Sequence, residues 1–162
     1  LWSSEKANKV MSELCPYVDI CIANEDDAVG IFSMDASKSD KEKNAYIAEE
    51  LTKSFPFIMV ASVWRTETSI TTFKLQSMIY TEGKAYYSKE YFMNILDYIG
   101  AGDAYCAGII YSIINNFDPQ KTVEFANAAS CLKHTVSGDF NLVTVDEVMK
   151  LAFSASGNEV SR

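Results

Sequence analysis

The stretch from Asp97 to Asn115, DYIGAGDAYCAGIIYSIIN, constrains the fold of this chain more than any other segment. Its Gly-Ala-Gly-Asp at residues 100–103 predicts a sharp turn, because glycine lets the backbone bend and approach other groups closely. The apolar run that follows predicts a buried helix. Amides in the first turn of a helix lack partners within the helix, and the helix dipole favours negative charge there. The sequence therefore predicts an anion site, most naturally for phosphate.

Asp103 is predicted to lie at the start of that helix, beside the phosphate site. The helix dipole keeps a carboxylate ionised at this position, and phosphoryl transfer to an alcohol needs a proton acceptor next to the phosphate. Gly100, Ala101, Gly102 and Asp103 are therefore the candidate catalytic residues. A plain helix cap is the alternative, because Gly-x-Gly-Asp is a short pattern.

The composition of the 162-residue chain is that of one globular domain, with 48% hydrophobic and 22% charged residues. A net charge of −8 argues against a nucleic-acid partner. The four cysteines have no C-x-x-C spacing, which favours reduced core thiols over a metal site or disulfides. The only histidine, His134, is expected to pack or cap near a helix end. We expect a cytoplasmic protein without a membrane partner, because no apolar run has the length of a membrane span and no signal peptide is recognisable.

Helical and strand patterns alternate along the chain, which predicts an α/β fold with a mainly parallel sheet flanked by helices. Buried strands are predicted at residues 18–23 and 57–63, and a hairpin at residues 71–80 and 84–88. Capping residues and apolar spacing predict helices from Ser3 or Ser4 to Pro16, from Asn24 through Phe32, from Asp40 to about Ser54, after the glycine turn, from Asp118 to near Gly138, and from Val145 to Phe153. Residues 34–43 are predicted to be a loop, and the tail from Ser154 is predicted to fray.

The segment from Asp97 to Tyr105, followed by Ala107 and Gly108, resembles the signature of the ribokinase-like (PfkB) carbohydrate kinases. The family's pattern is Asp-Thr-Thr-Gly-Ala-Gly-Asp-Ala-Phe, then a small residue and glycine. Here Tyr98 and Ile99 replace the two threonines. The resemblance implies a ribokinase-like fold and ATP-dependent phosphorylation of a sugar hydroxyl. The aspartate after the second glycine would be the base, and the amides of the turn would hold the developing charge.

An acidic cluster, Asn24-Glu25-Asp26-Asp27, directly follows the first predicted strand. Such a cluster can hold Mg²⁺, directly or through waters, beside nucleotide phosphates. The family has Asn-x-x-Glu at this point, so the resemblance implies a metal site at Asn24 and Asp27, with Asp27 one carbon shorter than the usual glutamate. The alternative is an acidic helix start that the helix dipole stabilises.

Asp97 is the candidate for a second ion. In relatives, the aspartate before the glycine turn and neighbouring carbonyls bind a monovalent cation, so the resemblance implies K⁺ at Asp97. The alternative is an aspartate that is satisfied by amides close to it in the chain.

Two further segments are candidates for nucleotide binding. Asn127 and Ser130 lie on the helix after Asp118-Pro119, where the family carries an asparagine and small residues that line the adenine pocket. Ser62 and Arg65 follow the second predicted strand, and an arginine can contact phosphate as a fork of N–H groups. Relatives often have a glycine loop at this second place, and this chain lacks those glycines. Helix packing and a solvated arginine are the alternatives.

Residues 133–143, KHTVSGDFNLV, followed by Asp146-Glu147-Val148, resemble the end of the family's kinases for 2-dehydro-3-deoxygluconate. The opening Leu1-Trp2-Ser3 resembles a stretch at mid-chain in the same kinases. The resemblance thus covers nearly the whole chain, but only the carboxyl-terminal half or so of a kinase. We therefore expect residues 1–162 to be the nucleotide-binding, carboxyl-terminal part of a ribokinase-like domain.

The expected activity is ATP-dependent phosphorylation of a primary hydroxyl on a sugar or sugar acid, foremost 2-dehydro-3-deoxygluconate. These residues alone are expected to be inactive, because in relatives the other half supplies most sugar contacts and the lid. A cut sheet edge would also favour association into a homo-oligomer. Two alternatives stay open: a related kinase for fructose, ribose or a nucleoside, and a non-catalytic nucleotide-binding module.

Overall fold

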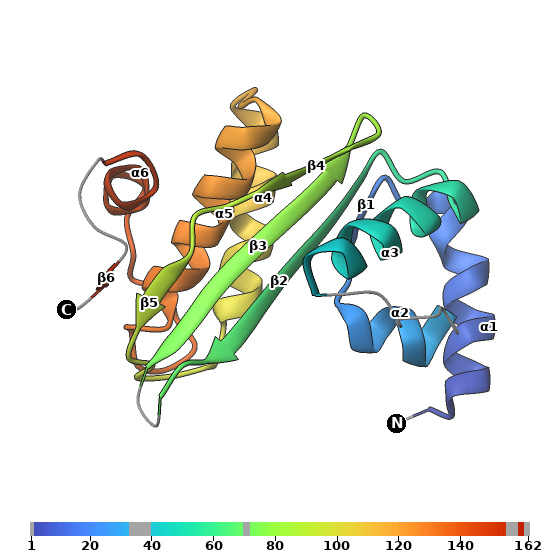
Figure 1. The fold of residues 1–162 in the computed structure, drawn as a ribbon, viewed down its shortest axis with the longest axis horizontal. Coiled ribbons are helices and arrows are strands. Elements are labelled where there is room, and N and C mark those ends of the chain that lie inside the picture. The colour runs from blue at the N-terminus through green and yellow to red at the C-terminus, as the bar shows by residue number, and fades with distance from the viewer. Residues whose placement is uncertain (1, 33–39, 70–71, 155–158, 161–162) are drawn as a thin grey trace. The chain divides into compact units, whose positions relative to one another are not determined.

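The computed structural model describes residues 2–32, 40–69, 72–154 and 159–160, and its ribbon is drawn in Figure 1. The chain forms two compact units. The first consists of residues 1–62 and 78–85, and the second of residues 63–77 and 86–162. Most of the predicted loop at residues 34–43 and of the predicted fraying tail lies outside the described residues.

Along the chain, the first unit begins with a helix, a short strand and two further helices. Its elements are α1 (Ser4–Leu14), the 3₁₀ turn η1 (Cys15–Tyr17), β1 (Ile20–Ile22), α2 (Glu25–Phe32) and α3 (Asp40–Ser54). The predicted cap of α1 is confirmed, because the side chain of Ser3 accepts a hydrogen bond from the amide of Lys6. The three helices agree with their predicted ranges, whereas β1 is shorter than the predicted strand at residues 18–23.

The next three strands, two of which form the predicted hairpin, contribute residues to both units. β1 pairs in parallel with the first part of β2 (Met59–Glu67), with Ile20 opposite Met59. β3 (Phe73–Thr81) pairs with β4 (Lys84–Tyr87) around Glu82 and Gly83, whose φ angles are 54° and 73°. Positive φ at both central residues is the signature of the tight turns that join hairpin strands, so the hairpin is confirmed.

The sheet is mixed rather than mainly parallel in the described part of the chain. β5 (Tyr91–Met93) pairs antiparallel with β3, and β6 (Glu159–Val160) pairs in parallel with β5. The strand order is β1-β2-β3-β5-β6, with β4 paired to β3. β2, β3 and β4 run in alternating directions (Figure 1), because their short connections cannot carry the chain back to begin a parallel strand. The α/β fold with flanking helices is confirmed, and the expectation of a mainly parallel sheet is corrected.

Three helices complete the second unit: α4 (Ala101–Ile114), α5 (Pro119–Lys133) and α6 (Val145–Phe153). The predicted caps are present, with Asp118 at α5 and a capping box at α6. α4 and α5 pack closely, because a Cβ added at Gly108 would lie only 2.7 Å from the Cα of Ala126. Buried side chains of α5, α6 and the sheet form the core of this unit, namely Leu75, Tyr91, Met93, Phe125, Leu132 and Val148.

α5 ends earlier than the sequence predicted, at Lys133 rather than near Gly138. The amides of Thr135 and Val136 bond to the carbonyls of Leu132 and Lys133, three residues back, which tightens and closes the last turn. The chain then enters the loop that leads to Gly138, whose φ is 80°.

The four cysteines are free thiols, but the predicted core position holds for only two of them, since Cys21 and Cys106 are half-buried. Cys15 and Cys131 are buried, and burial raises the pKa of Cys131 to about 12. Among the described helices, none combines the length and the apolar character needed to cross a membrane.

Candidate active site

The glycine turn before α4 has a backbone that only glycine tolerates. Gly100 caps the helix with a φ of 77°. A Cβ at this position would lie 2.9 Å from the carbonyl oxygen of Asp139 and 3.2 Å from Cε of Lys133. At Gly102 an added Cβ would meet nothing within 4 Å. The turn is therefore packed against protein at its first glycine and open at its second.

The first turn of α4 carries amides without protein partners. The amide of Ala101 points to the carbonyl of Tyr98 at 3.5 Å, and that of Ala104 donates to the carbonyl of Gly100 at 2.9 Å. Within the described residues, no main-chain carbonyl accepts from the amides of Gly102 and Asp103. Such amides at a helix start form a site for an anion.

The carboxylate of Asp103 lies in the same helical turn and is exposed to solvent. In the part of the chain that the structure describes, no hydrogen bond or ion pair engages it. A carboxylate in this state can accept a proton from a neighbouring hydroxyl, because neither packing nor a protein partner occupies its oxygens.

Asp97 ties two loops together. Its Oδ1 accepts a hydrogen bond from the amide of Ile99 at 3.0 Å, and its Oδ2 accepts one from the amide of Gly138 at 2.8 Å. These two bonds, from Ile99 first, lower the pKa of Asp97 below its usual value. The Ile99 bond matches the alternative in which local amides satisfy this aspartate, whereas the Gly138 amide comes from 41 residues further along the chain.

Lys133 is a buried polar residue next to the glycine turn that the sequence did not single out. It is fully buried, and its Nζ donates to the carbonyls of Gly138 at 2.7 Å and Val136 at 3.2 Å. A buried ammonium is rare unless it is paired. The one signal in the sequence was the position of this lysine at a helix end, directly before a short glycine-containing loop.

Arg65 is held in place by two rings. Its Nη1 lies 3.2 Å from Nε2 of His134, and its guanidinium lies over the ring of Tyr98, 4.6 Å from the centroid. Nδ1 of His134 lies 2.8 Å from the carbonyl oxygen of Ser130. A carbonyl only accepts, so Nδ1 carries the hydrogen and Nε2 accepts from the arginine. Burial, the main cause, lowers the pKa of His134.

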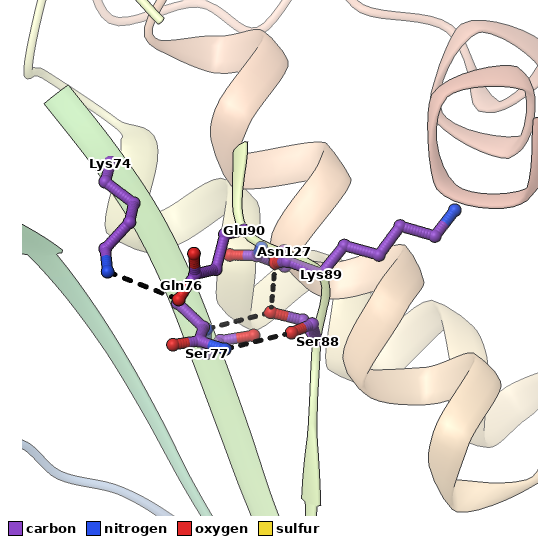
Figure 2. Close-up of polar contacts among 7 residues, drawn as sticks. All are labelled: Lys74, Gln76, Ser77, Ser88, Lys89, Glu90 and Asn127. Carbon is purple, nitrogen blue, oxygen red and sulfur yellow. Dashed lines mark hydrogen bonds and ion pairs between the residues drawn. The ribbon is translucent and has the colours of Figure 1, made fainter. Parts of the chain in front are cut away.

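Asn127 and Ser130 are buried on α5 rather than presented to solvent. Figure 2 shows the Asn127 side chain beside the segment of residues 88–90, and its Nδ2 donates to the carbonyl of Lys89 at 3.0 Å. The Asn127 Oδ1 is buried and has no partner within the described residues. The burial of both side chains matches the alternative of helix packing.

The polar cluster in Figure 2 joins β3 to α5 through that segment. Oγ of Ser88 accepts from the amide of Ser77 at 2.9 Å, and the carbonyl of Ser88 accepts from Nε2 of Gln76 at 3.2 Å. Lys74 and Glu90 form an ion pair at 3.2 Å beside these bonds. The cluster fixes the chain that leads into β5, and it satisfies main-chain groups that burial would otherwise leave unpaired.

The three other predicted site residues belong to the first unit. Asn24 and Asp27 cap α2 reciprocally: Oδ1 of Asn24 accepts from the amide of Asp27 at 2.9 Å, and Oδ2 of Asp27 accepts from the amide of Asn24 at 3.0 Å. Ser62 is buried and donates to the carbonyl of Ala23. Among the described residues, no three His, Cys, Asp or Glu side chains gather as a metal site.

Comparison with known proteins gives a consistent set of relatives. The family model described as "pfkB family carbohydrate kinase" matches residues 1–144. A 2-dehydro-3-deoxygalactonokinase of Haloferax volcanii is 28% identical over 152 residues, which is 93% of this chain and 43% of that protein. A 5-dehydro-2-deoxygluconokinase of Clostridium perfringens is 33% identical over 91 residues, 53% of this chain and 27% of that protein.

The solved structures agree with the sequence relatives. The crystal structure of a 2-dehydro-3-deoxygluconokinase from Thermotoga maritima superposes with a TM-score of 0.90 at 40% identity, covering 95% of this chain and 47% of that one. A PfkB family carbohydrate kinase from Listeria grayi has a TM-score of 0.84 at 31% identity, with 95% and 47% covered. The chain thus spans less than half the length of these full-length relatives.

Proposed function

Because this chain belongs to the pfkB family of carbohydrate kinases, we propose that the whole protein transfers the γ-phosphoryl group of ATP to a hydroxyl of a sugar acid. The proposed acceptor is 2-dehydro-3-deoxygluconate. It is supported by the 40% identity to the Thermotoga maritima enzyme and by the Haloferax volcanii relative, which is named for the galactonate epimer. A related acceptor such as fructose, ribose or a nucleoside is the alternative.

The observation that carries the proposal is the first turn of α4, where two amides without protein partners stand in the same turn as an exposed carboxylate. We assign the base to Asp103. It takes the proton of the acceptor hydroxyl while the hydroxyl oxygen attacks the γ-phosphorus, and the bond to the leaving ADP breaks in line. The amides of Gly102 and Asp103 hold the charge on the phosphoryl oxygens, which needs no reorganisation because the turn is already formed.

The nucleotide site is proposed to include Arg65, whose orientation by Tyr98 and His134 leaves further N–H groups for a phosphate. Ser62, Asn127 and Ser130 are proposed for the nucleotide site from the family resemblance alone, since all three side chains are buried.

The family resemblance implies two metal ions, Mg²⁺ and K⁺, and the residues of this chain fit only Mg²⁺. When bound with the nucleotide phosphates, Mg²⁺ would neutralise part of their charge. The Asn24–Asp27 pair fits a contact through water, because one carboxylate oxygen of Asp27 stays outside the reciprocal cap. K⁺ at Asp97 does not fit, because the neighbouring carbonyls of Val136 and Gly138 already accept from the ammonium of Lys133, and each Asp97 oxygen already accepts an amide. The use of ATP and the four free thiols support a cytoplasmic location.

The test is a coupled assay of ADP release with the full-length protein over a panel of 2-dehydro-3-deoxygluconate, its galactonate epimer, 5-dehydro-2-deoxygluconate, fructose, ribose and adenosine. We expect a specificity constant at least about tenfold higher for a 2-dehydro-3-deoxy sugar acid than for the last three acceptors. Phosphorus NMR of the product should show a phosphomonoester. Nucleotide binding without phosphorylation of any acceptor would instead indicate the non-catalytic alternative.

A further inference from the structure

Lys133 places a positive charge inside the second unit. Its side chain is 0% exposed. Its Nζ donates to the main-chain carbonyls of Gly138 and Val136, and no ion pair with a carboxylate satisfies it among the described residues. Its hydrogen-bond partners are neutral carbonyl oxygens, and the Asp97 carboxylate interacts with it electrostatically without forming a salt bridge.

The charge lies directly under the glycine turn. Cε of Lys133 would be 3.2 Å from a Cβ at Gly100, so the end of the lysine side chain packs against the residue that caps α4. The loop that supplies the carbonyls also donates the amide of Gly138 to Asp97, three residues before the turn. Lys133 therefore supports, through two contacts, the backbone that holds the amides of Gly102 and Asp103.

Main-chain carbonyls that converge on a cation are the ligands that proteins use for K⁺. Here the carbonyls of Val136 and Gly138 are already taken by an ammonium that belongs to the chain. We propose that Lys133 is a built-in cation of the anion-binding turn, which holds the turn and attracts phosphate in place of a monovalent metal ion. The inference rests on the proposed function, and it predicts a kinase that does not depend on K⁺.

A purely structural lysine is the competing explanation, and cation dependence separates the two. The full-length protein is titrated with the non-hydrolysable ATP analogue AMP-PNP and Mg²⁺ by calorimetry, in KCl, NaCl or tetramethylammonium chloride at equal ionic strength. We expect the wild-type dissociation constants in the three salts to agree within about twofold, since no metal ion enters the site. An increase in affinity of tenfold or more in KCl would overturn the proposal.

Lys133→Ala removes the charge and leaves space for a small cation. In tetramethylammonium chloride we expect the dissociation constant of AMP-PNP to rise at least about tenfold above the wild-type value. Adding K⁺ or methylammonium should then lower the dissociation constant of the variant at least about fivefold. Lys121→Ala is the matched control, since this lysine lies on the same helix with an exposed side chain, and it should behave as wild type in every salt.

Unchanged binding by Lys133→Ala, or a loss that neither cation restores, would contradict the proposal. Circular dichroism checks that the variant is folded, and if it is not, the wild-type salt series decides. Failure of the wild-type protein to bind AMP-PNP in any salt would overturn the proposed function itself and the inference with it.

Discussion

The two glycines of the turn before α4 should respond in opposite ways to alanine. At Gly100, a φ of 77° costs an alanine roughly 1–2 kcal/mol. The new methyl group would also lie 2.9 Å from a main-chain oxygen of Asp139, and overpacking of this kind costs about 1–3 kcal/mol. Gly100→Ala should therefore lower the free energy of unfolding by about 2–5 kcal/mol.

Gly102→Ala should do the reverse. Gly102 lies inside α4, and a Cβ there meets nothing within 4 Å, so alanine should stabilise the helix by about 0.5–1 kcal/mol. The same methyl group would stand on the open side of the turn, where we place the phosphate. The KM for ATP should therefore rise about tenfold or more, although the protein is more stable.

Urea unfolding and steady-state kinetics of the full-length protein measure both effects. The urea midpoint should move down for Gly100→Ala and up for Gly102→Ala, with unchanged slope. Gly30→Ala in α2 is the matched control, since a Cβ at Gly30 also meets nothing within 4 Å, and its kinetics should stay at the wild-type level. A wild-type midpoint for Gly100→Ala, or an unchanged KM for ATP in Gly102→Ala, would refute the reasoning.

Two further predictions concern packing and pH. Gly108→Ala would put a methyl group 2.7 Å from Cα of Ala126 and should lower the free energy of unfolding by about 1–3 kcal/mol. The Gly30→Ala control should not lower it. Equal urea midpoints for the two variants would contradict the close approach of α4 and α5. Burial lowers the pKa of His134 in the folded protein. At a pH below about 6.5, the ordinary pKa of histidine, the unfolded chain therefore binds more protons than the folded chain. Stability should therefore fall as the pH drops from about 6.5 towards 5, and His134→Gln should flatten this dependence in urea unfolding; an unchanged pH dependence in the variant would disprove the assignment.

Local signals were sufficient to predict most helix starts. Ser3, Asp118 and Thr144 each place a side-chain acceptor before a helical pattern, and each caps its helix in the structure. Such signals depend on a few consecutive residues. β5 and β6, with three and two residues, have no such signal, because pairing with distant strands defines them rather than their own pattern.

Burial was the part of the candidate site that the sequence did not reveal. Asn127 is a polar residue among small ones, a pattern typical of a ligand-binding position, yet its side-chain amide is buried and bonded to the carbonyl of Lys89. Lysine is usually a surface residue, yet Lys133 is fully buried. For Asn127 the covering segment lies 38 residues away in the sequence, whereas Lys133 is bound by the loop that directly follows it, at Val136 and Gly138. The burial of both residues depends on how these segments fold back, which a local sequence pattern does not indicate. The glycine turn was predictable because its conformation depends on its own residues.

The turnover of Asp103→Asn in the full-length protein tests the central claim most directly. Asparagine keeps the shape of the side chain but cannot take a proton, so kcat for 2-dehydro-3-deoxygluconate should fall by about 10³-fold. The KM values should change less than about threefold, because the amides that bind the phosphate are intact. Asp146→Asn, an exposed aspartate in the first turn of α6, should retain wild-type turnover. A kcat for Asp103→Asn within tenfold of the wild-type value would contradict the assignment of the base.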